Sequence, residues 1–330
     1  MKKKKIIKWG VIGYGNASEQ FLDKFENNNI SKIYAIASIS KKKIRPRDKK
    51  KSILLYDSYL DLIKDKKIDI IYISLPNNLH NYWASMSVKY NKHILIEKPA
   101  MISSRDMKSI LKLAKKKKKY VFESIYFRSH PNIEKLIKLL KIFNLKKILS
   151  IHASFGNDAL GGKKFFGIRL KKPKKNKRLF NPNMYGGSIW DTGCYPITFV
   201  NIFTILFFNK VLKKKNIIYS KRKIGFTKVD MSSEIIFKLK NTKIFLKTSI
   251  EENLDNNIKI NFEGGSLKID NLLNIGKKIN VMLFKNNIKK KIHVIKSKEN
   301  IFKNFIKKIN LTIIENKNKF HFPSITNKET

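Results

Sequence analysis

The chain has 330 residues, 72 of them basic and 24 acidic, which gives a formal net charge of +48. Only seven of the basic residues are arginines, and the lysines are spread through every segment. Proteins that read phosphates and bases rely on the planar arginine fork and gather their cations on one surface. The composition therefore argues against a dedicated nucleic-acid-binding protein, although nonspecific affinity for polyanions at low salt is expected.

The length and the single cysteine limit the organisation of the chain. At 330 residues, two domains are expected. Cys194 alone cannot build a disulfide framework, which fits a reducing compartment, so we expect a cytoplasmic protein. The basic start Met1–Lys5 resembles a signal peptide, but the apolar residues after it are few and run into a glycine turn. We expect no membrane association and no metal site.

The first predicted strand, Ile6–Ile12, leads into a turn and a helix that suggest a dinucleotide site. Gly13 would allow the tight turn, and Gly15 would let a pyrophosphate approach the helix start. The third position of the fingerprint is Ser18 rather than glycine, so an ordinary strand-to-helix turn remains an alternative. The cofactor contacts expected from this turn are Gly13, Gly15, Asn16 and Ala17.

The second predicted strand, Lys32–Ser40, bears on the choice of cofactor. NAD-binding folds place an acid near this point to bind the ribose 2′-hydroxyl. Here Ser38 stands there, and Ile39, Ser40 and Lys41–Lys43 follow it. Because no carboxylate is present to repel a 2′-phosphate, the sequence favours NADP(H) over NAD(H), with Ser38, Ser40 and a nearby lysine as the pocket. The alternative is that these lysines belong to the general lysine enrichment.

Strands and helices alternate up to about residue 125, which predicts a doubly wound parallel sheet in a domain spanning residues 1–125. The other predicted elements are a serine-capped helix at Ser58–Lys64, a strand at Ile68–Leu75, a helix ending near Tyr90, a strand at His93–Ile96, a helix capped by Ser103 and a strand at Tyr120–Phe127.

Polar residues follow two of these strands at the edge where ligands gather in such sheets. Pro76, Asn77 and His80 follow one strand, and Glu97-Lys98-Pro99 follows the next. A lysine at this edge is useful if it polarises a substrate, and Pro99 would allow a cis peptide bond that aims it. The alternative for Lys98 by itself is a solvated lysine at a strand end.

Residues 126–330 change character and are expected to form an α+β domain. A helix within Arg128–Leu140 comes first, and the segment between Gly156 and Asn183 is expected to be a functional loop or disordered. The predicted strands are Lys147–Phe155, Ile217–Ile224, Ser233–Leu239, Lys243–Ile250, Asn257–Glu263, Ser266–Ile269, Ile279–Phe284 and Ile288–Ile295. Their alternation predicts a mostly antiparallel open sheet, one face of which must be covered by helices or by a second subunit.

A second group of polar residues opens an apolar helix in this half. The segment from Tyr185 to Pro196 contains Gly186-Gly187, Asp191 and Tyr195. Asp191 and Tyr195 are four apart, so on one helix they would share a face. A tyrosine that exchanges a proton beside a charged lysine is plausible acid–base chemistry. The alternative is a capping aspartate and a tyrosine at a helix start.

Taken together, Gly13-Tyr14-Gly15, Leu75-Pro76-Asn77 with His80, Glu97-Lys98-Pro99 and Gly186-Gly187 with the segment Asp191–Pro196 resemble the superfamily of glucose–fructose oxidoreductase, inositol dehydrogenase and the MocA proteins. Tyr195 stands where inositol dehydrogenase-like members carry histidine, so the chain is more similar to the branch of glucose–fructose oxidoreductase and dihydrodiol dehydrogenase. The resemblance implies a Rossmann domain and an α+β domain whose open sheet commonly mediates dimers or tetramers. It also implies NAD(P)-dependent hydride transfer at a carbinol carbon of a sugar, cyclitol or related ring.

The resemblance also implies roles for individual residues. The matches are Lys98, Asp191 and Tyr195 for catalysis, Pro76, Asn77, His80, Glu97 and Lys98 for the cofactor, and Arg128, Asp191 and Tyr195 for the substrate. In the reaction so implied, Tyr195 takes the proton of a substrate hydroxyl. Lys98 lowers the pKa of that tyrosine, and Asp191 orients the sugar or holds Lys98.

Three departures from the family pattern keep other functions open. Ser18 replaces Ala or Gly, and Ile39 stands where many NADP-using members have arginine. After the predicted helix Asn300–Glu315 and the segment Phe320–Pro323, the chain stops at Thr330 where relatives add another helix, which would fit a truncated gene product. The alternatives are a catalytically silent cofactor-binding relative and a basic nucleic-acid-associated protein.

Overall fold

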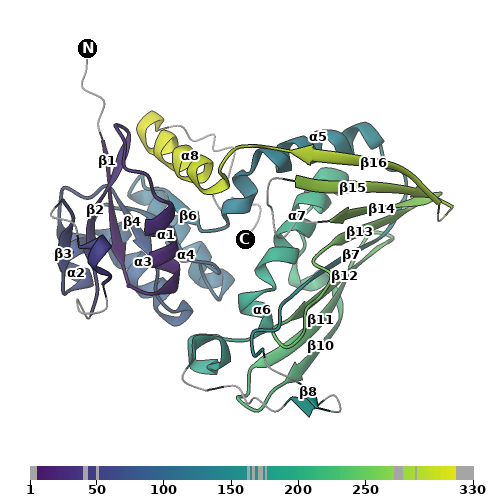
Figure 1. The fold of residues 1–330 in the computed structure, drawn as a ribbon, viewed down its shortest axis with the longest axis horizontal. Coiled ribbons are helices and arrows are strands. Elements are labelled where there is room, and N and C mark those ends of the chain that lie inside the picture. Colours follow the sequence, from purple (N-terminus) through teal and green to yellow (C-terminus); the bar gives the residue numbers. More distant parts are fainter. Residues whose placement is uncertain are drawn as a thin grey trace. The chain divides into compact units, whose positions relative to one another are not determined.

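The computed structural model describes residues 6–39, 44–49, 52–161, 164–165, 168–169, 174, 177–270, 278–286 and 288–316. Within them the chain forms two compact units, which are described separately (Figure 1). The first unit combines the residues up to His130 with those from Glu299 onward, and the second spans Pro131–Lys298. The break at His130 lies close to the boundary expected after residue 125.

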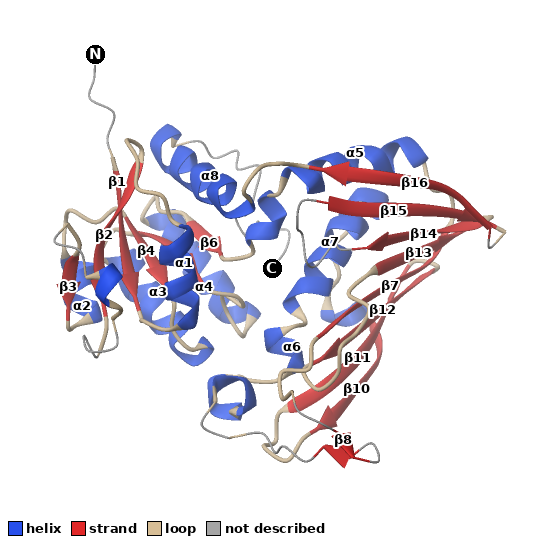
Figure 2. Ribbon diagram, in the orientation of Figure 1, coloured by secondary structure: helices blue, strands red, loops and turns tan. Residues whose placement is uncertain are grey.

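The first unit is built on a six-stranded parallel sheet in the order β3-β2-β1-β4-β5-β6 (Figure 2). The strands are β1 Ile7–Ile12, β2 Ser31–Ala37, β3 Leu54–Tyr56, β4 Ile70–Ile73, β5 His93–Ile96 and β6 Val121–Glu123. The helices are α1 Asn16–Lys24, α2 Tyr59–Lys64, α3 His80–Lys89, α4 Ser104–Lys116 and α8 Ile301–Glu315. This strand order is that of the dinucleotide-binding Rossmann fold, and it confirms the predicted doubly wound sheet.

Apolar residues on both faces of the sheet form the core of this unit. All four residues of β4 are buried, as its unbroken apolar sequence predicts for a central parallel strand. Helices α2, α3 and α4 cover one face through residues such as Leu62, Val88 and Ile110. Helices α1 and α8 cover the other face through Phe21 and Phe305.

The C-terminal helix α8 packs in the first unit, whereas we expected it in the second domain. Phe302 meets Phe21 of α1 edge-on, with ring centroids 5.3 Å apart. The indole Nε1 of Trp9 donates to Asn310 Oδ1 at 3.0 Å, and Asn310 Nδ2 donates to Ser31 Oγ at 2.8 Å. These contacts hold α8 against β1 and β2, although almost the whole length of the chain separates α8 from these strands in sequence.

The helix starts confirm the predicted caps, but the sixth strand is shorter than predicted. Ser58 and Ser103 accept the backbone N–H groups of Asp61 and Asp106 at 3.2 and 3.0 Å. The strand predicted at Tyr120–Phe127 ends at Glu123 and is followed by a 3₁₀ helix at Tyr126–Ser129. From Ile125 onward, the backbone forms hydrogen bonds within its own segment instead of with a neighbouring strand. The first of these is donated by the Ile125 N–H to the Glu123 carbonyl oxygen at 2.7 Å.

The second unit is built on an eight-stranded sheet in the order β10-β11-β12-β7-β13-β14-β15-β16. The strands are β7 Ile148–Gly156, β10 Ile217–Ile224, β11 Asp230–Leu239, β12 Thr242–Ser249, β13 Ile258–Phe262, β14 Gly265–Asp270, β15 Lys278–Lys285 and β16 Ile288–Lys296, with a separate ribbon of β8 Lys164–Phe165 and β9 Ile168–Arg169. The helices are α5 Pro131–Phe143, α6 Ser188–Asp191 and α7 Cys194–Phe208. Only the pair β12–β7 is parallel within the large sheet, which confirms the mostly antiparallel prediction.

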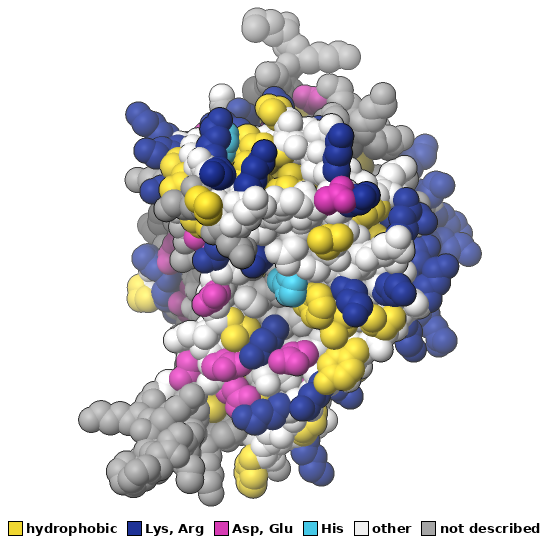
Figure 3. Space-filling view, turned by 90° about the vertical axis from the view of Figure 1, so that its right-hand side faces the viewer, with side chains coloured by type: hydrophobic (Ala, Val, Ile, Leu, Met, Phe, Trp, Pro, Cys, Tyr) yellow, Lys and Arg dark blue, Asp and Glu magenta, His cyan; other side chains and the backbone are white. Residues whose placement is uncertain are grey.

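Helices cover one face of this sheet and leave the other exposed in the single chain. Helices α5, α6 and α7 contact β16, β11 and β7, respectively. On the opposite face, seen in Figure 3, apolar, basic and acidic side chains are intermixed. His152 stacks on Phe245 there with ring centroids 4.4 Å apart, and Ile292 and Val294 are 49% and 45% exposed.

Candidate functional site

The turn between β1 and α1 has the geometry of a dinucleotide-binding turn. Gly13 has a φ of +87°, and a Cβ on it would lie 2.5 Å from the carbonyl oxygen of Ser74. Only glycine fits this left-handed, crowded position. A Cβ on Gly15 would meet nothing within 4 Å, and Gly15, Asn16 and Ala17 are exposed at the start of α1. The first N–H groups of a helix are an anion-binding arrangement, so the turn fits a pyrophosphate.

Ser18 fills the position of the missing third glycine without disturbing the packing. Its side chain is completely buried between helix and sheet. Its Oγ accepts the Gly15 N–H at 2.8 Å and donates to the Gly15 carbonyl oxygen at 2.9 Å. A buried hydroxyl is tolerated when it is hydrogen-bonded, and here the bonds also close the first turn of α1.

His80 connects the turns that follow β4 and β5. Its ring is completely buried, with Nε2 2.8 Å from the carbonyl oxygen of Leu75 and Nδ1 3.0 Å from that of Pro99. Burial lowers the pKa of His80. In this structure both ring nitrogens are occupied by backbone, so His80 holds the two turns together. Asn77 is buried beside it and Pro76 is half-buried.

The segment Glu97-Lys98-Pro99 begins directly after β5, at the carboxyl edge of the sheet. Glu97 Oε1 accepts the Tyr72 hydroxyl at 2.5 Å, and its Oε2 accepts the backbone N–H of Lys98 at 3.2 Å. The Lys98–Pro99 peptide bond is cis, a geometry that Pro99 allows, and the Lys98 side chain is half-buried. Burial and the Glu97 carboxylate raise the pKa of Tyr72, so that residue remains a neutral donor.

The end of β2 places Ser38 beside β3. Ser38 is buried, and its backbone N–H donates to the Tyr56 carbonyl oxygen at 3.1 Å. Ser40 and Lys41–Lys43, which we expected in a 2′-phosphate pocket, lie outside the described residues.

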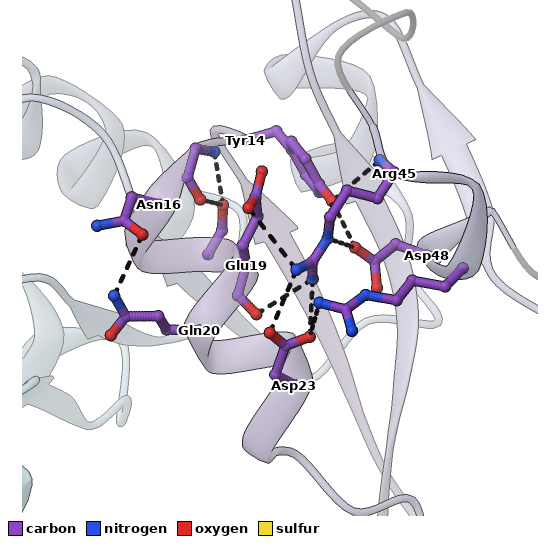
Figure 4. Close-up of polar contacts among 10 residues, drawn as sticks. Tyr14, Asn16, Glu19, Gln20, Asp23, Arg45 and Asp48 are labelled. Carbon is purple, nitrogen blue, oxygen red and sulfur yellow. Dashed lines mark hydrogen bonds and ion pairs between the residues drawn. The ribbon is translucent and has the colours of Figure 1, made fainter.

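A cluster of charged residues missed in the sequence lies next to the dinucleotide turn (Figure 4). The hydroxyl of Tyr14 donates to Asp48 Oδ2 and accepts Arg45 Nε at 3.1 Å. Burial and Asp48 raise the pKa of Tyr14. Arg45 also pairs with Asp23 of α1, Nη2 to Oδ1, at 2.9 Å. The cluster fastens the connection between β2 and β3 to the turn and to α1.

In the second unit, two glycines and a buried aspartate position helix α6. A Cβ on Gly186 would lie 2.3 Å from the Leu179 carbonyl oxygen, and one on Gly187, whose φ is +111°, would lie 2.1 Å from Asp230 Oδ1. The Asp230 carboxylate accepts the Ser188 hydroxyl at 2.6 Å and the Ile189 N–H at 2.8 Å. A carboxylate at a helix N-terminus is favourable, and the glycines let the backbones approach.

This packing places Arg178 against Asp191. Arg178 Nη2 donates to Asp191 Oδ1 at 2.6 Å, with the two side chains 39% and 21% exposed. Sequence reasoning assigned Asp191 to the site but missed Arg178. The sequence did contain a signal for Arg178. An arginine in a chain dominated by lysine indicates a position that uses the planar guanidinium group for hydrogen bonding.

The expectation that Asp191 and Tyr195 share one helix face is wrong. Helix α6 ends at Asp191, and α7 begins at Cys194 after a break at Thr192-Gly193. Tyr195 therefore lies in the first turn of the second helix, where its ring packs against Phe155 with centroids 4.8 Å apart.

No single helix in the described ranges is long and apolar enough to cross a membrane. The segments Pro182–Asp191 and Cys194–Phe208 together have the length and apolar composition of a membrane-spanning segment, but a bend of 48° separates them.

The candidate residues thus fall into two groups. The first unit brings together the turns of Gly13, His80 and Lys98 at one sheet edge, and Arg128 lies half-buried in its 3₁₀ helix. The second unit brings Asp191 to Arg178 and Tyr195 to Phe155. Among the residues that the structure describes, no group of three or more His, Cys, Asp or Glu could hold a metal ion.

Comparison with known proteins agrees with this arrangement. Residues 7–124 match the family described as an oxidoreductase family with an NAD-binding Rossmann fold. The chain is 25% identical over 207 residues to D-xylose 1-dehydrogenase (NADP(+)) of Hypocrea jecorina, covering 59% of this chain and 52% of that protein. It is 26% identical over 198 residues to trans-1,2-dihydrobenzene-1,2-diol dehydrogenase of Xenopus tropicalis, covering 59% and 56%. The matched part is about half the length of these relatives.

Two solved structures share the fold over nearly the whole chain. The 3-ketoreductase KijD10 of Actinomadura kijaniata, in complex with NADP and TDP-benzene, aligns with a TM-score of 0.81 at 18% identity, over 96% of this chain and 92% of its own. The aldose-aldose oxidoreductase of Caulobacter crescentus, complexed with glycerol, aligns with a TM-score of 0.73 at 15% identity, over 95% and 91%.

The chain has a Rossmann unit and an α+β unit, and the turn after β1 has the geometry of a dinucleotide-binding turn. The match over residues 7–124 is to the Gfo/Idh/MocA family of oxidoreductases, which is the family that the motifs in the sequence resemble.

Proposed function

We propose that the protein is an NAD(P)-dependent oxidoreductase that transfers hydride between the nicotinamide and a carbinol carbon of a sugar, cyclitol or related ring. The observation that carries the proposal is the meeting of three turns at the carboxyl edge of one parallel sheet. Gly13 approaches Ser74, and His80 bridges Leu75 and Pro99 beside Lys98. In sheets of this order, ligands bind outside the carboxyl ends where the strand order reverses, here between β1 and β4.

The residues proposed to hold the cofactor are those of these turns. Gly13, Gly15, Asn16 and Ala17 would bind the pyrophosphate, and Ser38 would lie at the ribose. The turn after β4 and Glu97 would line the nicotinamide side. When bound, the nicotinamide supplies a carbon that exchanges hydride with the substrate. We propose NADP(H) rather than NAD(H), and the names of two relatives in the comparison specify NADP.

Proton transfer is assigned to the protein's own side chains. We propose that Tyr195 exchanges the proton of the substrate hydroxyl and that the positive charge of Lys98 lowers the pKa of that tyrosine. Asp191, paired with Arg178, would accept a hydrogen bond from the substrate, and Arg128 is a further residue proposed to contact the substrate. The alternative role for Asp191, that it holds Lys98, stays open, because the carboxylate can accept further hydrogen bonds besides that of Arg178 Nη2.

The test is a comparison of Lys98→Met with the wild type. We expect turnover of sugars and cyclitols to be lost, while NADPH binding, followed by fluorescence titration, is retained. Lys89→Met on helix α3 removes the same charge away from the carboxyl edge and serves as the control. Turnover close to the wild-type rate in Lys98→Met would contradict the assignment. Failure of the wild type to bind either cofactor would contradict the proposed function itself.

We also propose that the exposed face of the second sheet mediates a homodimer or homotetramer. Support comes from its half-exposed apolar residues, including Ile292 and Val294. Light scattering of the purified protein at moderate salt tests this. A monomer at micromolar concentration would contradict it, and Ile292→Lys is expected to shift the wild-type oligomer towards monomers. A cytoplasmic location remains a prediction from the single cysteine.

A further inference from the structure

The charged cluster in Figure 4 joins the two segments that would face opposite ends of the cofactor's adenosine half. Tyr14 belongs to the dinucleotide turn, and Arg45 and Asp48 belong to the connection that follows β2. In Rossmann folds the pyrophosphate lies at the turn and the ribose 2′ position lies at the end of β2. The cluster is therefore placed where the charge of the ribose substituent matters.

Arg45 is the centre of this cluster. Its Nε lies 2.8 Å from Asp48 Oδ2, its Nη2 lies 2.9 Å from Asp23 Oδ1, and its Nη1 lies 3.7 Å from Glu19 Oε2. Its backbone N–H also donates to the Tyr14 hydroxyl at 3.1 Å. The Arg45 and Asp48 side chains are only 22% and 11% exposed. The Arg45 guanidinium is therefore paired with carboxylates of the protein itself.

The carboxylates change the argument for cofactor choice. The sequence favoured NADP(H) because no acid follows β2. The structure nevertheless connects Glu19, Asp23 and Asp48 to the turn through Arg45, which also donates to Tyr14, and two of these carboxylates come from α1. Carboxylates near the ribose repel a 2′-phosphate, which is how NAD sites select against NADP. Here Arg45 contacts all three, whereas Arg47, whose side chain is 60% exposed, pairs with Asp23.

We propose that Arg45 is a positioning residue for cofactor choice, which neutralises Glu19, Asp23 and Asp48 and thereby allows the site to accept a 2′-phosphate. The inference rests on the proposed function, because it concerns the same cofactor. It replaces the simple reading in which the absence of an acid after β2 suffices. In this role Arg45 acts through the carboxylates and does not itself contact the phosphate.

The ratio of NADPH to NADH affinity tests the proposal, because the two cofactors differ only in the 2′-phosphate. We expect Arg45→Met to weaken NADPH binding about tenfold or more in a fluorescence titration at fixed ionic strength, and NADH binding less than about threefold. Arg47→Met is the matched control, and it should change neither affinity by more than about twofold because that pair is exposed.

Two further variants separate charge from structure. Arg45→Met combined with Asp48→Asn removes one of the carboxylates that Arg45 neutralises and should recover part of the NADPH affinity. Arg45→Lys keeps the charge without the fork, so it should keep the NADPH to NADH ratio even if its melting temperature falls. Equal loss of both cofactors in Arg45→Met, or no recovery in the double variant, would overturn the proposal. Wild-type protein that binds neither cofactor would instead refute the proposed function.

Discussion

At the scale of single residues, His80 shows how a motif residue can hold two turns in place. Its ring is completely buried, and both nitrogens face backbone carbonyl oxygens of the turns after β4 and β5. A neutral imidazole can donate to only one of two carbonyls, whereas the charged form is disfavoured by burial. Burial is the larger influence here, and it lowers the pKa of His80 from its ordinary value of 6.5.

This lowered pKa predicts a dependence of stability on pH. As the pH falls below about 6.5, the unfolded chain binds a proton at His80 that the native state does not, so the free energy of unfolding decreases. Above that pH both states are neutral and the effect vanishes. We expect urea unfolding at pH 7.5 and 5.5 to show a smaller pH-dependent loss for His80→Asn than for the wild type. An equal loss in both proteins would contradict the prediction.

Arg178 is expected to matter for turnover more than for folding. Its ion pair with Asp191 is partly exposed, and such pairs contribute at most about 1 kcal/mol to stability. If Asp191 orients the substrate, Arg178→Met should lower kcat/KM by about tenfold or more while shifting the melting temperature little. The neighbouring Lys177→Met is the control. Unchanged kinetics in Arg178→Met would remove Asp191 and Arg178 from the site.

At the scale of elements, helix α8 decides how complete the cofactor-binding unit is. Phe302, Phe305 and Ile309 of α8 fill the same core as Trp9 and Phe21. The helix is amphipathic in sequence, but amphipathicity indicates only that one face is buried and not which sheet buries it. The hydrogen bonds of Asn310 with Trp9 and Ser31 are specific contacts that place α8 in the first unit.

We therefore expect a substitution in α8 to destabilise the cofactor-binding unit. Phe305 is fully buried, so Phe305→Ala should cost about 3–5 kcal/mol of unfolding free energy. Saturating NADPH should raise the melting temperature of the variant, because a ligand of the native unit stabilises it. Ile314→Ala on the same helix, at a 41% exposed position, should cost far less. Similar losses for the two variants would argue against the packing of α8 described here.

At the scale of the whole molecule, the net charge of +48 predicts behaviour unrelated to the site. Scattered lysines bind polyanions by counterion release, so affinity for heparin or duplex DNA should fall steeply between about 50 and 200 mM salt. Cofactor binding depends on a formed site and should fall less. Salt-resistant, sequence-selective binding of nucleic acid, measured by fluorescence anisotropy, would favour the nucleic-acid-associated alternative instead.

The sequence predicted the local structure closely. Strand β10 has the predicted bounds, and the serine caps of α2 and α4 lie where expected. These features depend on neighbouring residues, and local patterns report them well. The sixth strand was overestimated because its apolar residues continue into a 3₁₀ helix, which hydrophobic patterning does not distinguish.

By itself, the sequence determined the order of the elements, the family resemblance and the segments that carry Gly13, Lys98 and Tyr195, because these follow from motifs and short-range periodicity. Only the tertiary structure decided which charges meet. Arg45 with the carboxylates of α1, and Arg178 with Asp191, are contacts between segments whose approach depends on packing and on glycines such as Gly187. Such pairings leave no periodic signal, because electrostatic contacts require proximity in space rather than a spacing along the chain.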